Sequence, residues 1–125
     1  MGETTSGERV RVLVVEDSED QAELLRHYLE KAGCDVTTVV TAEQAIEAYR
    51  ADQHDLAVVD LQLPGMDGWQ LSTQLKKDRP ECAIAITSVL DAAQFPEADA
   101  ILPKPFTGKQ IRDVLRSTVP AWTSR

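Results

Sequence analysis

Hydrophobic residues along this chain alternate between short continuous runs and stretches in which they recur every three or four positions. Continuous apolar runs rich in β-branched residues are typical of strands buried on both faces, whereas a three-to-four spacing is typical of helices. Four such runs and one segment of valines with intervening threonines predict five strands: Val10–Val15, Val36–Val40, Leu56–Val59, Ala83–Ile86 and Ala100–Leu102. The intervals between them predict helices, so strand and helix alternate along the chain.

Residues typical of helix ends flank these intervals. A hydroxyl residue stands three positions before a glutamine, which is the spacing of a capping box, at Ser18 with Gln21, Thr41 with Gln44, and Thr107 with Gln110. Asp67 can cap the third helix, and Gly33 lies where the first helix should end. These signals predict regular helices after the first, second, third and fifth strands.

Alternating strands and helices predict a doubly wound α/β domain, because parallel strands need crossovers long enough to place helices on both faces of the sheet. Threonines interrupt the second strand and prolines bound the fifth, so both suit the edges of the sheet. We therefore expect a flavodoxin-like, five-stranded parallel sheet in the order 2-1-3-4-5. The interval from Ser88 to Asp99 is close to the minimum for a crossover and contains Pro96, which predicts a shortened or irregular fourth helix.

Length and charge limit what such a domain can do. The 125 residues fit a single domain over 9–120, with a flexible leader at 1–8 and a short tail at 121–125. A formal net charge of −8 argues against direct binding of nucleic acid. No apolar run approaches the roughly 20 residues of a membrane-spanning helix, and the N-terminus lacks a signal-peptide core, so we expect a cytoplasmic protein without membrane insertion.

Several single residues have simpler structural interpretations. Cys34 and Cys82 belong to no metal-binding motif, so we expect reduced, packed thiols. We expect His27 and His54 to be solvated surface histidines, and Trp69 to pack at the start of the third helix. Trp122 could be an exposed partner contact, but a frayed helix end is the simpler interpretation.

Polar residues follow four of the predicted strands at the point where each strand ends. They are Glu16 and Asp17 after the first strand, Asp60 after the third, Thr87 after the fourth and Lys104 after the fifth. Each alone could be a solvated strand end or a helix cap. Ligands of open α/β sheets bind at the carboxyl ends of the strands, so we expect the five residues to converge on one site.

Three carboxylates in one pocket repel one another unless a cation lies among them. Oxygen ligands that leave positions open for water and a phosphoryl oxygen are typical of Mg²⁺. Such a site suits phosphoryl transfer, in which an aspartate attacks phosphorus while a cation neutralises the transferring group. Asp60, Lys104 and Thr87 fit the roles of nucleophile, ammonium group and hydrogen-bond donor to the product.

These residues resemble the receiver domains of two-component response regulators, from Val10 to Val119. The matching motifs are the Glu16-Asp17 pair, Asp60 followed by LQLPGMDG, Thr87, and Lys104-Pro105-Phe106. The resemblance implies a single-domain receiver in which Asp60 takes a phosphoryl group from a histidine kinase or a histidine phosphotransfer protein. Phosphorylation and dephosphorylation would be self-catalysed and Mg²⁺-dependent, so the chain would act as a signalling phosphoacceptor rather than as an enzyme.

The resemblance also implies a ligand set. Asp17, Asp60 and the backbone carbonyl of Gln62 would bind Mg²⁺ directly, and Glu16 would act through water. Lys104 would contact the phosphoryl group, and its peptide bond to Pro105 would be cis. The cognate kinase, the downstream target or fused output domain, and the oligomeric state stay open.

One position departs from the receiver pattern. Ile101 stands three residues before the lysine, where most receivers carry an aromatic residue that swings with the hydroxyl residue on phosphorylation. Isoleucine has no ring and restricted χ1 freedom, so we hypothesise that the signal is transmitted by reordering of the Ser88 to Asp99 loop.

Two other functions compete with that of a phosphorylated receiver. The departures at the output face would also fit a receiver-like interaction module that works without phosphorylation, although the intact acidic pocket argues against it. An aspartyl-phosphate hydrolase would share the nucleophile and Mg²⁺, but those enzymes typically use a DxD motif, and Gln62 stands at the position of the second aspartate.

Overall fold

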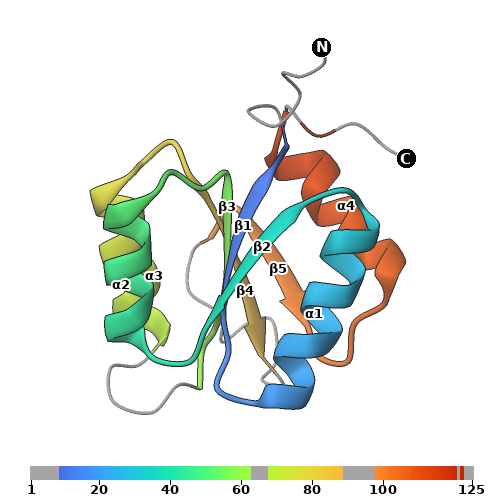
Figure 1. The fold of residues 1–125 in the computed structure, drawn as a ribbon, viewed down its shortest axis with the longest axis horizontal. Coiled ribbons are helices and arrows are strands. Elements are labelled where there is room, and N and C mark those ends of the chain that lie inside the picture. The colour runs from blue at the N-terminus through green and yellow to red at the C-terminus, as the bar shows by residue number, and fades with distance from the viewer. Residues whose placement is uncertain (1–8, 63–67, 89–97, 121, 123–125) are drawn as a thin grey trace.

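The structure, a computed structural model, describes residues 9–62, 68–88, 98–120 and 122. Five parallel strands form one sheet in the order β2-β1-β3-β4-β5, which confirms the predicted topology. The strands are β1 (Arg11–Val15), β2 (Asp35–Val39), β3 (Leu56–Asp60), β4 (Ala83–Ser88) and β5 (Ala100–Pro103). The helices are α1 (Glu19–Lys31), α2 (Ala42–Ala51), α3 (Gly68–Asp78) and α4 (Gly108–Thr118) (Figure 1).

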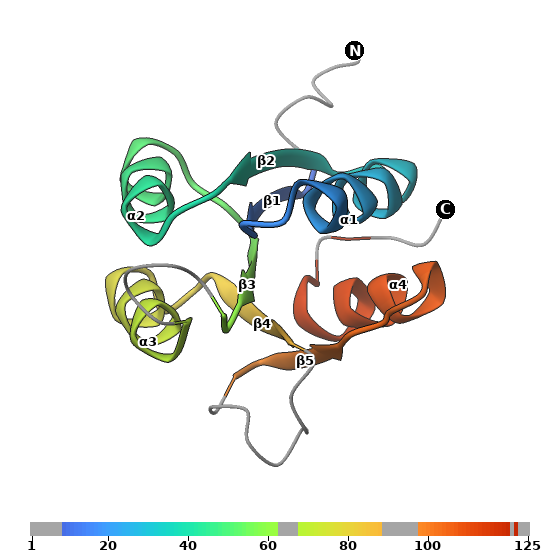
Figure 2. The ribbon, with the colours of Figure 1, turned by 90° about the horizontal axis from the view of Figure 1, so that it is seen from below.

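Helices cover both faces of the sheet, as a doubly wound fold requires. Figure 2 shows α1 and α4 on one face and α2 and α3 on the other. The predicted fourth crossover helix falls mainly on residues 89–97, which lie outside the described residues, as do the leader at 1–8 and most of the tail. Among the described residues, no helix is both long and apolar enough to cross a membrane.

The sheet separates two hydrophobic cores, because side chains alternate between its faces along each strand. Val12 and Val14 of β1 face the core that contains Leu25 of α1 and Leu115 of α4. The other core contains these residues of β1, α2 and α3: Leu13, Val15, Ala42, Ala45, Leu71 and Leu75. Strands β3 and β4 are buried at every position, whereas β2 and β5 carry exposed residues and form the two edges.

The predicted helix ends are confirmed where the structure describes them. The Ser18 hydroxyl accepts a hydrogen bond from the Gln21 N–H, and complete capping boxes form at Thr41 with Gln44 and at Thr107 with Gln110. Gly33 follows α1 with a φ of 91°, in the left-handed region that favours glycine. Asp67, the predicted cap of α3, lies outside the described residues.

The interpretation of His54 as a solvated residue is wrong. Only 8% of its surface is exposed. Its ring stacks on Tyr49 with an interplanar angle of 5° and a centroid separation of 6.2 Å. His54 follows the end of α2, and the chain folds back there to begin β3, which brings the imidazole onto a ring of the preceding helix. His27 is exposed, as expected.

The interpretation of Trp122 as part of a frayed end is also wrong. Its indole N–H donates to the Ala32 carbonyl at 2.9 Å, and the residue is 8% exposed. The guanidinium of Arg116 lies 5.9 Å from the ring centroid. The backbone N–H of Trp122 donates to the Val119 carbonyl, so the chain turns after α4 and returns to the core beside α1. Trp69 is partly buried against the other core, and Cys34 and Cys82 are reduced, buried thiols, as predicted.

The burial of His54 predicts a pH dependence of stability. Desolvation, assisted by the nearby Arg11 charge, lowers the pKa of His54 below its ordinary value of 6.5. As the pH falls below about 6.5, His54 therefore becomes protonated in the unfolded chain while it is still neutral in the folded chain. Through this group the free energy of unfolding should decrease by at most about 1.4 kcal/mol per pH unit. Above that pH the contribution of neutral His54 is fully present.

Urea unfolding of wild type and His54→Phe at pH 7.5 and 5.5 measures this contribution, since phenylalanine can stack on Tyr49 but does not titrate. We expect a smaller loss of stability between the two pH values in the variant, and no such difference for His27→Phe at the exposed site. An equal loss in wild type and His54→Phe would contradict the assignment.

Candidate functional site

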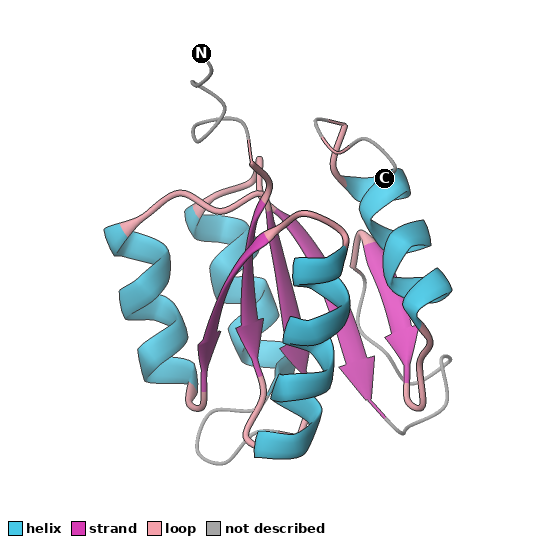
Figure 3. Ribbon diagram, turned by 45° about the vertical axis from the view of Figure 1, so that its right-hand side comes forward, coloured by secondary structure: helices cyan, strands magenta, loops and turns pink. Residues whose placement is uncertain are grey.

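Three carboxylates meet at the carboxyl ends of the central strands. Strands β1 and β3 are parallel neighbours, with Val15 opposite Val59, so the residues that follow them lie side by side. All five arrowheads point to one edge of the sheet, the lower edge in Figure 3. One carboxylate oxygen from each of Glu16, Asp17 and Asp60 lies within 4.8 Å of the other two. The three acids therefore lie together, as predicted.

The ammonium group of Lys104 lies between two of these carboxylates. Its Nζ is 2.9 Å from Glu16 Oε1 and 3.3 Å from Asp60 Oδ2. The side chains are 14% exposed for Lys104 and no more than 4% for either acid, so water screens these contacts weakly. The Lys104–Pro105 peptide bond is cis, as the resemblance implied. The lysine thus joins the first, third and fifth strands at one point.

Thr87 lies beside Asp60, because the two residues are partners in the register of β3 and β4. It is completely buried, and its Oγ1 has no hydrogen-bond partner among the described residues. The backbone here is held by the Leu61 N–H, which donates to the Thr87 carbonyl at 3.2 Å. A buried hydroxyl without a partner costs free energy, and this one lies where it could donate to a ligand bound beside Asp60.

Gln62 approaches the site through its backbone. Its N–H donates to Asp60 Oδ1 at 3.0 Å, while its side chain is exposed. This bond orients the Asp60 carboxylate, and the other oxygen, Oδ2, points toward Lys104. The role of the Gln62 carbonyl as a metal ligand stays a prediction.

Burial and the neighbouring charges shift the pKa values of Glu16 and Lys104. Burial raises the pKa of Glu16 to about 7; the bonds from Lys104 and the Ser18 N–H oppose this shift, and the neighbouring Asp60 carboxylate adds to it. Burial alone would lower the pKa of Lys104, but its bonds to Glu16 and its attraction to Asp60 outweigh burial and raise it. Lys104 therefore stays charged, and it compensates two buried acids.

The chemistry of the donor set fits a hard divalent cation. The group of three potential ligands found among the described residues consists of carboxylates, with Asp17 exposed to solvent beside the two buried acids. Both cysteines lie outside this group, which disfavours a zinc site. Carboxylates with an open, hydrated side are the arrangement that Mg²⁺ prefers.

Two features of the site could not be found from the sequence. The resemblance implies that Lys104 contacts a phosphoryl group, but nothing in the sequence indicates its bond to Glu16, 88 residues away. The Lys104 N–H also donates to the Ser88 carbonyl at 2.9 Å, which fixes the start of the loop that carries Pro105. Neither contact has a local sequence signal.

The position that departs from the receiver pattern lies away from this cluster. Ile101 is 42% exposed on β5 and belongs to neither core. The proposed reordering of the adjacent loop concerns residues that lie mostly outside the described part of the chain.

Comparisons with known proteins agree with the geometry. The family model described as response regulator receiver domain matches residues 12–116. Alkaline phosphatase synthesis transcriptional regulatory protein PhoP of Bacillus subtilis is 31% identical over 108 residues, which cover 81% of this chain and 45% of that protein. Aerobic respiration control sensor protein ArcB of Escherichia coli is 34% identical over 106 residues, which cover 78% of this chain and 14% of that protein. The chain spans less than half the length of both relatives.

Solved structures share the fold. A sensor protein from Polaromonas sp. JS666 is 30% identical with a TM-score of 0.79, and the match covers 92% of this chain and 99% of that chain. A CheY-like response regulator receiver domain protein from Methanospirillum hungatei JF-1 is 23% identical with a TM-score of 0.80, covering 86% of this chain and 91% of that chain.

The buried ion pairs predict how Lys104 affects stability. Lys104→Met should lower the free energy of unfolding by roughly 2 kcal/mol at pH 7.5 without divalent ions, because it leaves two buried acids without a cation. Urea unfolding measures the loss. Lys109→Met is the matched control, since Lys109 pairs with Asp113 at an exposed site and should contribute less than about 1 kcal/mol. Equal losses in the two variants would contradict the role of burial.

Proposed function

The chain belongs to the receiver domains of response regulators, and we propose that Asp60 accepts a phosphoryl group from a histidine kinase or a histidine phosphotransfer protein. The observation that carries this proposal is the position of the Lys104 ammonium, 3.3 Å from Asp60 Oδ2 in a pocket that two further acids share. A nucleophilic carboxylate with a fixed cation beside it is the arrangement that phosphoryl transfer requires.

The transfer replaces one bond to phosphorus by another. An Asp60 carboxylate oxygen forms a bond to phosphorus while the bond from phosphorus to the donor imidazole nitrogen breaks, and the electron pair of that bond stays on the imidazole. The bond from the Gln62 N–H holds the other carboxylate oxygen and so sets the direction of attack. The main contribution of the protein is positioning together with electrostatic stabilisation.

Lys104 and Thr87 stabilise the product. The ammonium group neutralises charge on the phosphoryl oxygens, and the Thr87 hydroxyl, which has no partner among the described residues, can donate to one of them. Both groups extend from the strands that follow Asp60 in the sheet, so they are in place before the donor arrives. Little reorganisation is then needed during transfer.

Asp17 and Asp60 would hold Mg²⁺ with the backbone carbonyl of Gln62, and Glu16 would hold one of its waters. When bound, the ion supplies positive charge to the carboxylates and to the phosphoryl oxygens. Glu16 is already bonded to Lys104 and to the Ser18 N–H, so its carboxylate is fixed in orientation. Asp17 is the exposed member and gives the site its open side.

The aspartyl phosphate would serve as a signal that changes the affinity of the chain for a partner, and the chain would not turn over a substrate as an enzyme does. PhoP of Bacillus subtilis, a transcriptional regulatory protein, and ArcB of Escherichia coli, an aerobic respiration control sensor protein, are both longer than this chain, and the match covers less than half of each. The partner and the output of this chain accordingly belong to the proposal, and we expect a cytoplasmic setting in which the kinase supplies the phosphoryl group.

Phosphorylation of Asp60 is tested by intact mass after incubation with Mg²⁺ and acetyl phosphate. We expect one phosphoryl adduct in wild type and none in Asp60→Asn, because the amide is not nucleophilic. Asp113→Asn, at an exposed aspartate of α4, is the control and should keep the adduct. An adduct that persists in Asp60→Asn would contradict the assignment. If neither acetyl phosphate nor beryllofluoride with Mg²⁺ modified or bound the wild type, the chain would be an interaction module that works without phosphorylation.

Metal binding and phosphoryl transfer should separate between two variants. Asp17→Ala should weaken Mg²⁺ binding by at least about tenfold, a loss that even substitutions of outer-shell residues reach. Lys104→Met should bind Mg²⁺ at least as well as wild type, since it removes a competing cation, but should be phosphorylated more slowly. Calorimetry measures the first property and the rate of adduct formation the second. Parallel losses of both properties in both variants would refute the division of roles.

A further inference from the structure

The last strand of the sheet has few bonds of its own to hold it in register. β5 has four residues, lies at the edge of the sheet and, within the described part of the chain, pairs only with β4. Pro103 lies opposite Ser88, and the Ser88 carbonyl accepts the N–H of Lys104, the residue that follows Pro103, as parallel pairing requires. An edge strand of four residues is held by few ladder bonds, yet Lys104 immediately follows it.

The opposite end of β5 is held by a side chain. The ladder begins with Ala100 opposite Ala85, which leaves the N–H of buried Ile84 without a backbone acceptor from β5. Asp99 supplies one: its Oδ2 accepts the Ile84 N–H at 2.8 Å, while the Asp99 N–H donates to the Ile84 carbonyl at 3.0 Å. This reciprocal pair closes the ladder one residue before the strand begins.

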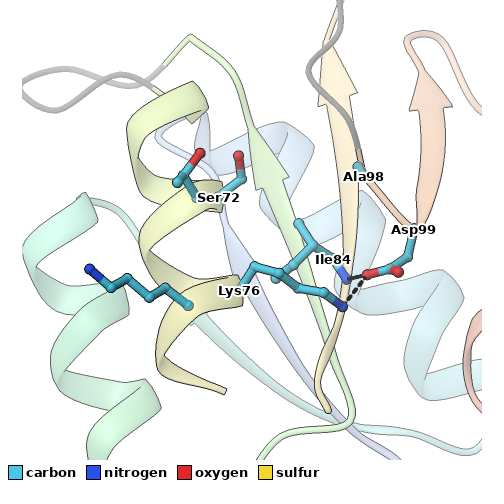
Figure 4. Close-up of a pocket in the computed structure, with 7 residues that line it drawn as sticks. Ser72, Lys76, Ile84, Ala98 and Asp99 are labelled. Atoms are coloured by element: carbon cyan, nitrogen blue, oxygen red, sulfur yellow. Dashed lines mark hydrogen bonds and ion pairs between the residues drawn. The ribbon is translucent and has the colours of Figure 1, made fainter. Parts of the chain in front are cut away.

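The same carboxylate oxygen also binds α3. Lys76 Nζ lies 2.8 Å from Asp99 Oδ2 (Figure 4). It also lies 3.3 Å from the Cys82 carbonyl. Burial alone would raise the pKa of Asp99, but the bonds from Lys76 and the Ile84 N–H outweigh it and lower the pKa. Asp99 is thus an anionic acceptor shared by a strand and a helix. Its side chain is 38% exposed beside a surface cavity, so a substitution there leaves both cores intact.

Register decides whether Lys104 reaches the acids. A slip of two residues along a strand moves a side chain by about 6.6 Å, and a slip of one residue turns it to the other face of the sheet. The distance from Lys104 Nζ to Asp60 Oδ2 is only 3.3 Å, so either slip would remove the ammonium group from the site. Local loosening of β5 would also move the Lys104 ammonium group away from the acids.

We infer that Asp99 is a positioning residue for Lys104: its carboxylate, held by Lys76 and by the Ile84 N–H, fixes β5 against β4 and so places the lysine ammonium at the acidic site. Asp99 acts from the far end of the strand and touches none of the reacting groups. The inference rests on the proposed function only for its effect on phosphorylation, because the placement of Lys104 can be measured separately.

The placement is tested first, without metal or phosphoryl donor. In ¹H–¹⁵N NMR spectra, hydrogen exchange with water should be slowed in wild type at the Lys104 backbone amide and ammonium group, since both are bonded in a poorly exposed environment. Asp99→Ala should accelerate exchange at both groups. Asp113→Ala, which removes another ion-paired aspartate but one whose ion-pair partners Lys109 and Arg116 both lie on α4, should leave them unchanged. Unchanged Lys104 exchange in Asp99→Ala would overturn the inference.

The rate of Asp60 phosphorylation by acetyl phosphate tests the consequence. Loss of a hydrogen bond to a charged group suggests a decrease of about tenfold for Asp99→Ala. Asp99→Asn keeps an oxygen acceptor for the Ile84 N–H and should stay within about threefold of wild type. Lys76→Met removes a half-exposed ion pair and a bond to the Cys82 carbonyl but leaves the Asp99 carboxylate bonded to the Ile84 N–H, so it should change the rate less than about twofold.

A double-mutant cycle separates positioning from general destabilisation. If Asp99 acts through Lys104, Asp99→Ala should cause no further loss in a Lys104→Met background. A full additional loss there would overturn the inference even if the single variant were slow. If wild type accepted no phosphoryl group, the proposed function would fail, while the exchange measurement would still decide whether Asp99 places Lys104.

Discussion

The structure depends on one buried interaction, the ammonium group of Lys104 between the carboxylates of Glu16 and Asp60. A parallel sheet brings the carboxyl ends of its strands to one edge, so residues that end separate strands must share one small volume. Two acids in that volume, both nearly inaccessible to water, would repel each other and would be costly to keep charged. The lysine from the last strand supplies the compensating charge and thereby links the beginning and the end of the domain.

The two cores explain why this arrangement can be held in place. Strands β3 and β4 are buried on both faces, so the backbone that carries Asp60 and Thr87 has packed side chains above and below it. Close packing of this kind resists small displacements, which keeps the acceptor oxygen and the neighbouring hydroxyl at fixed positions. The exposed member of the acidic group, Asp17, lies beyond the end of β1, where solvent and a ligand can reach it.

The sequence predicted those features whose causes are local. Apolar runs gave strands within one or two residues of their observed ends, and paired hydroxyl and glutamine residues gave the capped ends of α2 and α4. The convergence of Glu16, Asp17 and Asp60 followed from the topology once the strands were known. His54 and Trp122 were misjudged because their partners, a ring of the preceding helix and a carbonyl at the end of α1, come together only through the path of the folded chain. For the same reason, the bonds of Asp99 to Ile84 and Lys76 had no signal in the sequence.

Strand β5 is the element in which these local and long-range causes meet. Leu102 is buried opposite Thr87, whereas the neighbouring Ile101 is 42% exposed on the other face. An isoleucine has restricted χ1 freedom and no ring to move between inside and outside, so a change at Thr87 cannot reach the surface by the ring rotation that an aromatic residue would allow. Lys104, the residue just after β5, places its ammonium group at the acidic site. Asp99, the residue just before the strand, bonds to Lys76 of α3. A strand held at both ends by charged groups and only lightly by its own ladder therefore provides the physical connection between the site and the edge of the sheet.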